Sequence, residues 1–428
     1  MNLSADEGLW ATDDTGIGPR TKQRPLVVLV VPSGSYRTAD FVDAAKTLRV
    51  DLVVASDGDA PMSDLGRSRS MMVDFARPEW SAARIARIKP APDAVISADD
   101  RGVVIAAMAS ALLSISANPV AAASSTRDKA HMRVLLKRAG VEQPAFALAG
   151  SGEVAAVAGS IGYPCVVKPR GLSASRGVIR VDTPATAEAT EARIREIVTC
   201  SFGDADEPLL VESFVSGPEV AVEGMLIGGV LHVLAVLDKP DPLDGPFFEE
   251  TMFVTPSRHG AGLLEEITQL VQGATGALGL VSGPVHAEVR VGGTGPMLIE
   301  IAARSIGGLC GRSLSFGLLG ESLELLILRS ALHMPGSGLE RATAASGVLM
   351  LPIPMEGRLE SIDGIDEALA VEGITEFNQT IPNGKPVVPL PEGDRYLGFL
   401  FGEGLTPEAV ERSLREAQSQ IDVVISTG

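Results

Sequence analysis

Lysine is rare in this sequence of 428 residues, which contains only eight, so the setting of each one is informative. Lys168 ends the apolar stretch 164–167, where an ammonium group is costly unless it meets an anion. Gly171–Gly177 follows as a loop of small residues, including Ser173 and Ser175, whose backbone N–H groups can surround phosphate oxygens. The pattern indicates a phosphate site, and the simpler alternative is a surface lysine before a hairpin turn.

A second lysine, Lys129, follows Arg127 and Asp128 at the start of a helical pattern that runs to Leu136. By itself it indicates no more than a solvated lysine in the first turn of a helix.

Two apolar segments, Val285–Arg290 and Met297–Arg304, are separated by the turn Gly292–Gly295, which predicts a β-hairpin. Alternation with a period of two places three side chains on one face of each strand. These are His286, Glu288 and Arg290 on the first strand, and Leu298, Glu300 and Ala302 on the second. Facing carboxylates repel unless a cation lies between them, and Mg²⁺ bound with nucleotide phosphates takes such oxygen ligands. The alternative is a half-exposed hairpin whose two glutamates face solvent.

The hairpin is followed by Gly307–Gly311, a glycine-rich segment that lets the backbone approach a ligand closely. Neither Gly308 nor Leu309 fills space as an aromatic residue would, which predicts a roomy pocket beside this segment. The alternative is that Gly307 and Gly308 form only a tight turn with positive φ.

A further pair of carboxylates flanks a short connection. The apolar strand Leu209–Glu212 ends in one of them, and Gly217, Pro218 and Glu219 begin the next strand. Glu212 can bind a nucleotide base at the strand edge and Glu219 the ribose hydroxyls. The alternative is a plain hairpin.

The elements that must position these residues fall into an α/β part followed by α+β parts. Leu26–Val31 is a continuous apolar run, and helix-like residues separate it from the strands Leu52–Ala55 and Ala94–Ser97. This alternation predicts a Rossmann-like domain with a parallel sheet over residues 25–122. Its first turn, Pro32–Ser35, lacks a GxGxxG fingerprint, so we expect this domain to serve as scaffolding.

Composition shifts suggest the remaining boundaries. Small residues at Ala117–Thr126 precede an α+β domain over 123–334, in which alternating strands such as Glu219–Met225 predict antiparallel sheets. Short strands with glycine turns and the amphipathic helix Pro407–Gln420 predict a small closing α+β domain over 335–428. We expect residues 1–24, which are polar and contain four acidic side chains, to form a flexible tail.

Composition also limits the function. With 54 acidic and 36 basic residues the net charge is −18, which argues against nucleic-acid binding. No apolar run approaches the roughly 20 residues of a membrane helix. Since bulk nucleic acid is excluded, we expect small-molecule substrates. Cys165, Cys200 and Cys310 are an odd number with no CxxC spacing, so we expect a reducing, cytoplasmic location.

In their order along residues 25–425, these motifs resemble the ATP-grasp family. The resemblance rests on Asp128-Lys129, Lys168 with Gly171–Gly177, Glu212, Gly217-Pro218-Glu219, Glu288 and Glu300-x-x-x-Arg304. It implies that Lys129 and Lys168 bind the α- and β-phosphates of ATP, that Glu212 and the backbone to Val215 bind adenine, and that Glu219 binds ribose. It also implies that Leu298 lines the nucleotide site, that Glu288 and Glu300 hold Mg²⁺ or Mn²⁺, and that Arg304 contacts the transferred phosphoryl group.

One position departs from the common family pattern E-x-N-x-R, because Ala302 stands where a further metal ligand would be. The number of bound metal ions is therefore left open. Glu300-Ile-Ala-Ala-Arg304 is instead similar to the L-amino acid ligase subgroup, which forms dipeptides. Phe247–Thr251 with Pro256, Ala345–Gly357 and Gly398–Gly402 also resemble that subgroup.

The resemblance implies that a carboxylate, expected to be that of an amino acid, is activated by ATP as an acyl phosphate and is then attacked by an amine. The Gly171–Gly177 loop would act as a lid, and Glu249, Glu250 and His286 are unranked candidates for binding or deprotonating the amine. The alternatives are a purine-pathway ligase, a biotin-carboxylase-like enzyme and a nucleotide-binding module without turnover. We also expect a homodimer, formed through the first or last domain.

Overall fold

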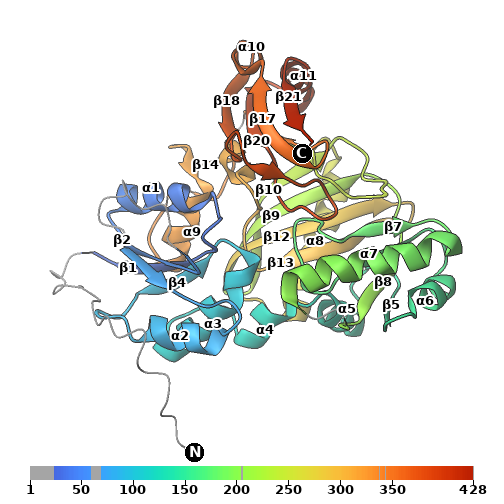
Figure 1. The fold of residues 1–428 in the computed structure, drawn as a ribbon. Coiled ribbons are helices and arrows are strands. Elements are labelled where there is room, and N and C mark those ends of the chain that lie inside the picture. Colours follow the sequence, from blue (N-terminus) through green and yellow to red (C-terminus); the bar gives the residue numbers. More distant parts are fainter. Residues whose placement is uncertain (1–23, 59–68, 204–205, 337, 343, 428) are drawn as a thin grey trace, which may run out of the picture.

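The computed structural model describes residues 24–58, 69–203, 206–336, 338–342 and 344–427. The predicted tail therefore lies outside the described residues, except for Arg24. As predicted, the protein is a mixed α/β and α+β multidomain structure (Figure 1). No helix of the described part is long and apolar enough to cross a membrane.

The N-terminal region contains a parallel four-stranded sheet of order β3-β2-β1-β4. Every residue of β1 is buried, as its continuous apolar run predicts. Strand β3 was not predicted, since its sequence Arg-Ser-Met-Met has no apolar alternation. The elements are β1 (Leu26–Val30), α1 (Thr38–Leu48), β2 (Asp51–Ser56), β3 (Arg69–Met72), α2 (Pro78–Ala86), β4 (Ala94–Ser97), η1 (Asp100–Gly102) and α3 (Val103–Leu113).

A small antiparallel sheet of order β5-β8-β6-β7 follows, at the right of Figure 1, with α6 and α7 packed on it. Helix α5 begins at Lys129 because the Asp128 carboxylate accepts from the N–H groups of Ala130 and His131. The elements are α4 (Val120–Ser125), α5 (Lys129–Arg138), β5 (Phe146–Ala149), α6 (Val154–Ile161), β6 (Cys165–Lys168), β7 (Ile179–Val181), α7 (Pro184–Phe202) and β8 (Leu209–Ser213).

A large eight-stranded antiparallel sheet occupies the centre, with the order β13-β12-β9-β10-β11-β16-β20-β18. Its first half contains the predicted hairpin, β12 and β13, joined by the turn at Gly292–Gly295. The elements of this segment are β9 (Glu219–Ile227), β10 (Val230–Lys239), β11 (Met252–Thr255), α8 (Ala261–Leu278), β12 (Gly283–Gly292), β13 (Gly295–Ala302), η2 (Cys310–Ser313), β14 (Ser315–Phe316), β15 (Glu321–Ser322) and α9 (Leu323–Ala331).

The C-terminal segment extends the same sheet across the predicted boundary at residues 334 and 335. Strand β10 pairs with β11 only at Asp238 and Val254, whereas β11 pairs with β16 along its whole length. The elements are β16 (Ala345–Leu351), β17 (Gly357–Asp363), α10 (Ile365–Leu369), β18 (Ile374–Gln379), β19 (Pro386–Val387), β20 (Gly398–Gly404), α11 (Pro407–Gln418) and β21 (Asp422–Ser426). Strands β19, β17 and β21 form a separate small sheet.

The largest hydrophobic core joins these parts. It includes Leu29 of β1, Leu237 of β10, Leu323 of α9 and Phe399 of β20, all fully buried. The N-terminal sheet and the central sheet, from β9 to β20, therefore share one core, and the cavity described below lies where they meet the small sheet.

Candidate active site

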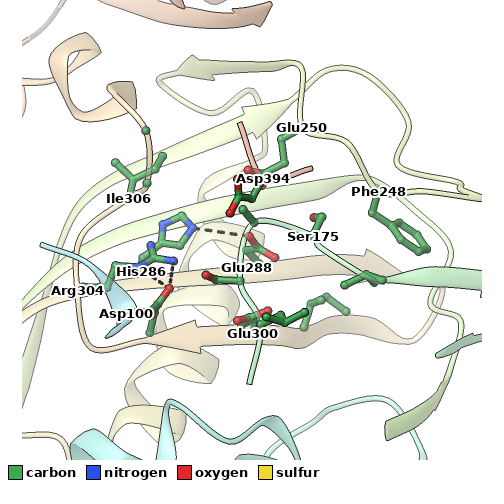
Figure 2. Close-up of a pocket in the computed structure, with 18 of the residues that line it drawn as sticks. Asp100, Ser175, Phe248, Glu250, His286, Glu288, Glu300, Arg304, Ile306 and Asp394 are labelled. Carbon is green, nitrogen blue, oxygen red and sulfur yellow. Dashed lines mark hydrogen bonds and ion pairs between the residues drawn. The ribbon is translucent and has the colours of Figure 1, made fainter. Parts of the chain in front are cut away.

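One cavity of about 580 Å³ brings together side chains from every part of the fold. Its walls include the N-terminal turn 32–37, the loop 172–175, the hairpin β12–β13 and the loop 394–396 (Figure 2). The motifs predicted from separate stretches of sequence thus surround a single space.

Both predicted lysines line this cavity and neither is solvated. Lys168 is buried, with Nζ 2.7 Å from Oε2 of Glu212. Burial lowers its pKa, and the Glu212 carboxylate opposes that shift. Lys129 is also buried, and its Nζ lies 2.9 Å from Oε1 of Glu300 and donates to the Leu172 carbonyl. Both ammonium groups therefore line the same cavity, each paired with a carboxylate.

Glu212 is held between two cations. Its Oε1 accepts from Nε of Arg133 at 2.5 Å while Oε2 faces Lys168. Burial alone would raise the pKa of Glu212, but Arg133 and Lys168 lower it to about 2. Glu212 therefore stays ionised near neutral pH and fixes Lys168.

The loop 171–177 has an unusual backbone conformation. Ala174 and Ser175 are both left-handed, with φ of 56° and 55°, which L-residues rarely adopt. Leu172, Ser173 and both left-handed residues line the cavity. Gly171 and Gly177 do not line it: the Gly171 carbonyl accepts from Arg127, and Gly177 donates to the Pro391 carbonyl.

The hairpin contains a β-bulge that the predicted alternation missed. Glu288 pairs with Glu300 as expected, but the next residue of β12, Val289, pairs with Leu298, so Ile299 is the extra residue. Leu298 is fully buried in the hydrophobic core under the sheet, and Ile299 lines the cavity instead. The prediction that Leu298 shares a face with Glu300 and lines the nucleotide site is therefore wrong.

Arg133 stabilises this bulge. It is fully buried on α5, four residues beyond Lys129, and donates to the carbonyls of Leu298 and Ile299 at 3.0 and 2.6 Å. The same side chain that holds Glu212 therefore also holds the strand that carries Glu300.

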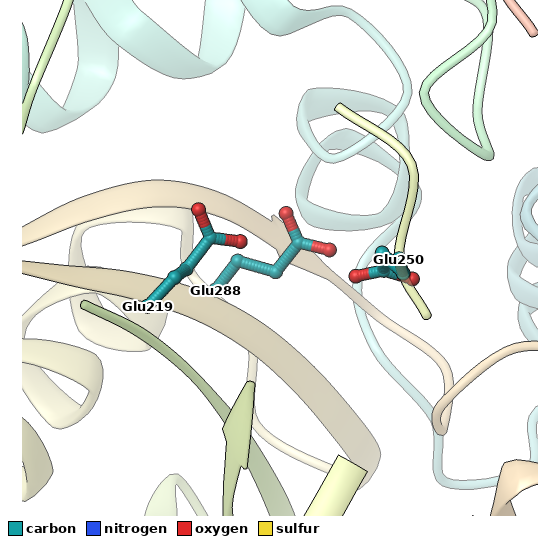
Figure 3. A group of neighbouring side chains, drawn as sticks. All are labelled: Glu219, Glu250 and Glu288. Carbon is teal, nitrogen blue, oxygen red and sulfur yellow. The ribbon is translucent and has the colours of Figure 1, made fainter. Parts of the chain in front are cut away.

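Three carboxylates converge beside the hairpin: Glu219, Glu250 and Glu288 each offer an oxygen, and these oxygens lie within 4.8 Å of one another (Figure 3). Nζ of Lys239, at the end of β10, is 2.6 Å from Glu219, 2.5 Å from Glu250 and 3.6 Å from Glu288. Glu288 is thus shared between this group and the predicted metal pair, whereas Glu300 is paired with Lys129.

Glu219 has both carboxylate oxygens engaged. Oε1 accepts from Lys239 and Oε2 accepts from Nε of Arg290 at 2.7 Å. Arg290 also donates to the Val215 carbonyl at 2.8 Å. Glu219 and Val215 line the cavity, and their predicted roles toward ribose and adenine stay predictions.

His286 lies between two carboxylates. Its Nδ1 is 2.6 Å from Oε1 of Glu223, and its Nε2 is 3.7 Å from Oε1 of Glu288 (Figure 2). Burial favours the neutral ring, but hydrogen bonding to these carboxylates raises the pKa of His286 to about 9. The ring is therefore an imidazolium at neutral pH, which suits charge balance rather than removal of a proton from an amine.

The structure distinguishes Glu249 from Glu250 by their positions relative to the cavity. Glu250 lines the cavity and contacts Lys239, whereas Glu249 does not line it. Burial raises the pKa of both carboxyl groups, and for Glu250 the nearby Glu288 adds to the rise although Lys239 opposes it. A carboxylate with a raised pKa in a cleft is a suitable proton acceptor for an amine, so Glu250 becomes the better candidate.

Arg304 is anchored by the N-terminal region. Its Nε and Nη2 donate to Oδ2 of Asp100 at 3.0 and 2.8 Å (Figure 2). Burial would raise the pKa of Asp100, but Arg304 and Arg127 lower it to about 2. The ionised Asp100 therefore sets the direction of the guanidinium.

The expectation that the first domain serves only as scaffolding is wrong. The carboxyl ends of its strands, including the turn Pro32–Ser35 and Asp100, form a wall of the cavity. Polar residues gather at this edge of a parallel sheet, and that rule was the available signal for Asp100. Lys239 also gave a signal, as one of eight lysines and at the end of an apolar strand.

Gly308 is required by the backbone. Its φ is +60°, and a Cβ there would lie 2.7 Å from the ring of Phe399. Leu309 is buried in the core. The turn interpretation of Gly307 and Gly308 is therefore favoured over the roomy pocket.

Comparison with known proteins agrees with this arrangement. Residues 161–313 match the ATP-grasp domain, and residues 349–426 match the L-amino acid ligase C-terminal domain 2. The crystal structure of an L-amino acid ligase from Bacillus licheniformis has the same fold, with a TM-score of 0.78 at 24% identity over 95% of this chain and 100% of that one.

Two relatives are similar in sequence. An uncharacterized protein of Sinorhizobium fredii is 29% identical over 70% of this chain and 61% of its own length. Alanine–anticapsin ligase of Bacillus subtilis is 28% identical over 51% of this chain and 49% of its own length. The chain thus spans less than two thirds of the length of these curated relatives.

Proposed function

We propose that this chain, whose residues 161–313 match the ATP-grasp domain and whose residues 349–426 match the L-amino acid ligase C-terminal domain 2, joins a carboxylate, that of an amino acid, to an amine, with conversion of ATP to ADP and phosphate. The observation that carries this proposal is the convergence of Lys129, Lys168, the loop 172–175, Glu300 and Arg304 on one cavity. The product would be an amide or a dipeptide.

The reaction has two steps. A carboxylate oxygen attacks the γ-phosphorus of ATP, and the bond from that phosphorus to the β,γ-bridging oxygen breaks. ADP is the leaving group, and the acid becomes an acyl phosphate. The amine nitrogen then attacks the acyl carbon, phosphate departs with the C–O bonding electrons, and the amine loses a proton. No residue of the protein becomes covalently attached.

The lysines and the loop act on the nucleotide. Lys129, Lys168 and the N–H groups of the loop 172–175 would bind its phosphates, and Glu212, Val215 and Glu219 its adenosine end. Since Glu212 fixes Lys168 and Arg133 fixes Glu212, the cationic group is held ready before ATP binds, as electrostatic stabilisation requires. Closure of the loop would exclude water, which would otherwise hydrolyse an acyl phosphate.

The donor set fits Mg²⁺ or Mn²⁺. Glu288 and Glu300, opposite each other in the hairpin, would hold the ion, and when bound it would offset negative charge on the phosphate oxygens. Arg304, held by Asp100, would stabilise the oxygen that becomes negative during attack on the acyl carbon. Glu250 would take the proton from the amine, and the imidazolium of His286 would balance the surrounding carboxylates.

We propose a cytosolic location, which the free thiols of Cys165, Cys200 and Cys310 support.

The test is phosphate and ADP release across a matrix of amino acids as acid and as amine, with product masses. We expect ADP formation that depends on both partners, with a product mass equal to their sum minus water. Lys168→Ala should lose ATP affinity while keeping the fold, and Lys137→Met, at an exposed position of α5, should behave as the parent protein. Unchanged ATP affinity in Lys168→Ala would remove that residue from the site.

A further inference from the structure

The loop between β19 and β20 reaches from the C-terminal region over the mouth of the cavity. Its Pro391 carbonyl accepts from the N–H of Gly177, and its Glu392 carbonyl accepts from Nε of Arg176 at 2.7 Å. The Glu392 side chain pairs with Arg193 of α7 at 2.6 Å. The loop is therefore fastened to the proposed phosphate-binding loop, and its next residues, Asp394, Arg395 and Tyr396, line the cavity.

Arg395 differs from the other cations of the cavity wall. Among the described residues that line the cavity, each other lysine or arginine has a carboxylate within 4 Å. The pairs are Arg37–Glu324, Arg101–Asp57, Lys129–Glu300, Lys168–Glu212, Arg290–Glu219 and Arg304–Asp100. Within the described part of the chain no residue forms an ion pair or hydrogen bond with the Arg395 guanidinium, and Arg395 is exposed. Among the described lining residues, Arg395 thus offers a guanidinium whose five donors are not engaged by the protein.

The N-terminal turn makes room for this side chain. A Cβ on Gly34 would lie 2.6 Å from Nη2 of Arg395, so the guanidinium occupies the space that a side chain at position 34 would need. Tyr36, two residues further, lines the same wall and packs edge-on against Phe399, with ring centroids 5.9 Å apart. Arg395 is therefore placed against the N-terminal wall, whereas the nucleotide groups are carried by α5, the loop 172–175 and the hairpin.

When the amine is itself an amino acid, as dipeptide formation requires, the substrate pair brings one carboxylate that does not react. The carboxylate of the activated acid becomes bonded to the phosphoryl group. The unreacted carboxylate therefore belongs to the amine. A guanidinium binds a carboxylate through two parallel hydrogen bonds and holds it in a fixed orientation. We propose that Arg395 is the residue that recognises a carboxylate on the amine substrate, and that the loop bearing it selects the amine. This inference rests on the proposed ligase activity.

The experiment compares an amino acid with its amide as the amine, because the two differ only in the carboxylate. The best amine from the matrix and its amide are assayed with the parent protein, Arg395→Gln and Gly34→Val. Arg412→Gln, an exposed arginine of α11, is the matched charge control. Arg395→Gln should lower kcat/KM for the amino acid about 10- to 100-fold and leave the amide unchanged, the fold-change expected for loss of a charge-assisted hydrogen bond.

Gly34→Val, which displaces the guanidinium without removing it, should shift the same ratio in the same direction. Equal losses for amino acid and amide would overturn the inference, because Arg395 would then act on the phosphoryl step or on folding. No loss for either would also overturn it.

Equilibrium binding separates this inference from the ligase proposal. The twenty standard amino acids and their amides are titrated into the ADP-loaded protein and into Arg395→Gln. Binding of amino acids but not amides, lost in the variant, supports the role of Arg395 even if no product forms. Equal binding of amides and amino acids by the parent protein contradicts it, whatever the turnover.

Discussion

Lys239 carries one positive charge into a group of three carboxylates that would otherwise repel one another. Its side chain is 3% exposed and lies over the ring of Phe253. Water therefore cannot take over the role of the ammonium group in offsetting the charge of the carboxylates. Breaking a buried ion pair from one side leaves uncompensated charge and costs about 3 to 5 kcal/mol. The Lys239 ammonium group therefore stabilises the folded structure of the site.

Lys239→Met should lower the free energy of unfolding by about 3 kcal/mol or more in the absence of divalent ions. Millimolar Mg²⁺ should restore part of that loss, because the freed oxygens of Glu219, Glu250 and Glu288 lie close enough to share an ion. The measurement is the urea midpoint with and without Mg²⁺. Lys46→Met, which breaks the exposed pair with Asp43, is the control and should change little. If Mg²⁺ leaves the urea midpoint of Lys239→Met unchanged, the three carboxylates do not bind an ion.

Glu300→Gln tests the proposed metal pair, since it removes a charge and keeps the shape. Turnover should fall ~10²-fold or more, with a higher Mg²⁺ requirement, as when an electrostatic stabiliser is lost. Glu416→Gln, on the exposed side of α11, should leave both quantities unchanged. Ordinary activity of Glu300→Gln at ordinary Mg²⁺ would place Glu300 outside the metal site.

At the scale of single residues, the sequence was most informative where a residue type is rare or costly to bury. Lys168 and Glu212 were placed near a ligand site on that ground, and both lie in the cavity wall. Their immediate partners were not predicted. Arg133, which pairs with Glu212, and Asp100, which pairs with Arg304, reach the site through tertiary packing, and no local pattern predicted these ion pairs.

Among the elements, the bulge in β13 explains why alternation failed at one position. The strand alternates correctly from Glu300 to Ala302, and the extra residue Ile299 reverses the order before it, so Leu298 faces the core. A bulge depends on a partner that satisfies the freed carbonyl groups. Here that partner is Arg133 of α5, which no pattern within the strand reveals.

The short helix η1 links the N-terminal sheet to Arg304 through Asp100, and this link should respond to acid. The carboxyl pKa is about 2 in the folded protein and about 3.9 in an unfolded chain. The group therefore binds fewer protons when folded. Its contribution, roughly 2 kcal/mol, should be present above pH ~4 and lost as the pH falls toward ~2.

Urea unfolding of the parent protein and Asp100→Asn at pH 7, 5, 4 and 3 measures this contribution. We expect the parent to be more stable at pH 7 and the difference to shrink as the pH falls. In the same variant kcat should fall more than the KM for ATP rises, because Arg304 loses its anchor while the phosphate contacts remain. A difference in stability that does not change with pH would show that Asp100 has an ordinary pKa.

For the whole molecule, the sequence predicted the layer types and their order, because each layer carries its own period of apolar residues. It did not predict that the N-terminal turn and the C-terminal loop meet over the same cavity. Gly34 and Arg395 are 361 positions apart, and their approach follows from the packing of β1, β10, α9 and β20 in one core. Local sequence patterns do not reveal contacts between residues so far apart in the chain.

The assembly state is a prediction at the same scale. We expect a homodimer through the first or last domain, with a mass in light scattering of twice the 44.5 kDa of one chain. A mass of one chain across micromolar concentrations would contradict it.

The central sheet has a consequence for building hybrids between related ligases. The domain boundary predicted from composition suggests exchanging the C-terminal part at residue 334, yet such a crossover separates β11 from β16, which pair along the full length of β11. The pairing between β10 and β11 is much shorter, because only Asp238 and Val254 pair there. Recombination should therefore place its junction in the connection after Lys239, so that β11, β16, β20 and β18 are inherited from one parent. The loop with Arg395 would travel with that unit, and amine preference would pass to the hybrid together with it.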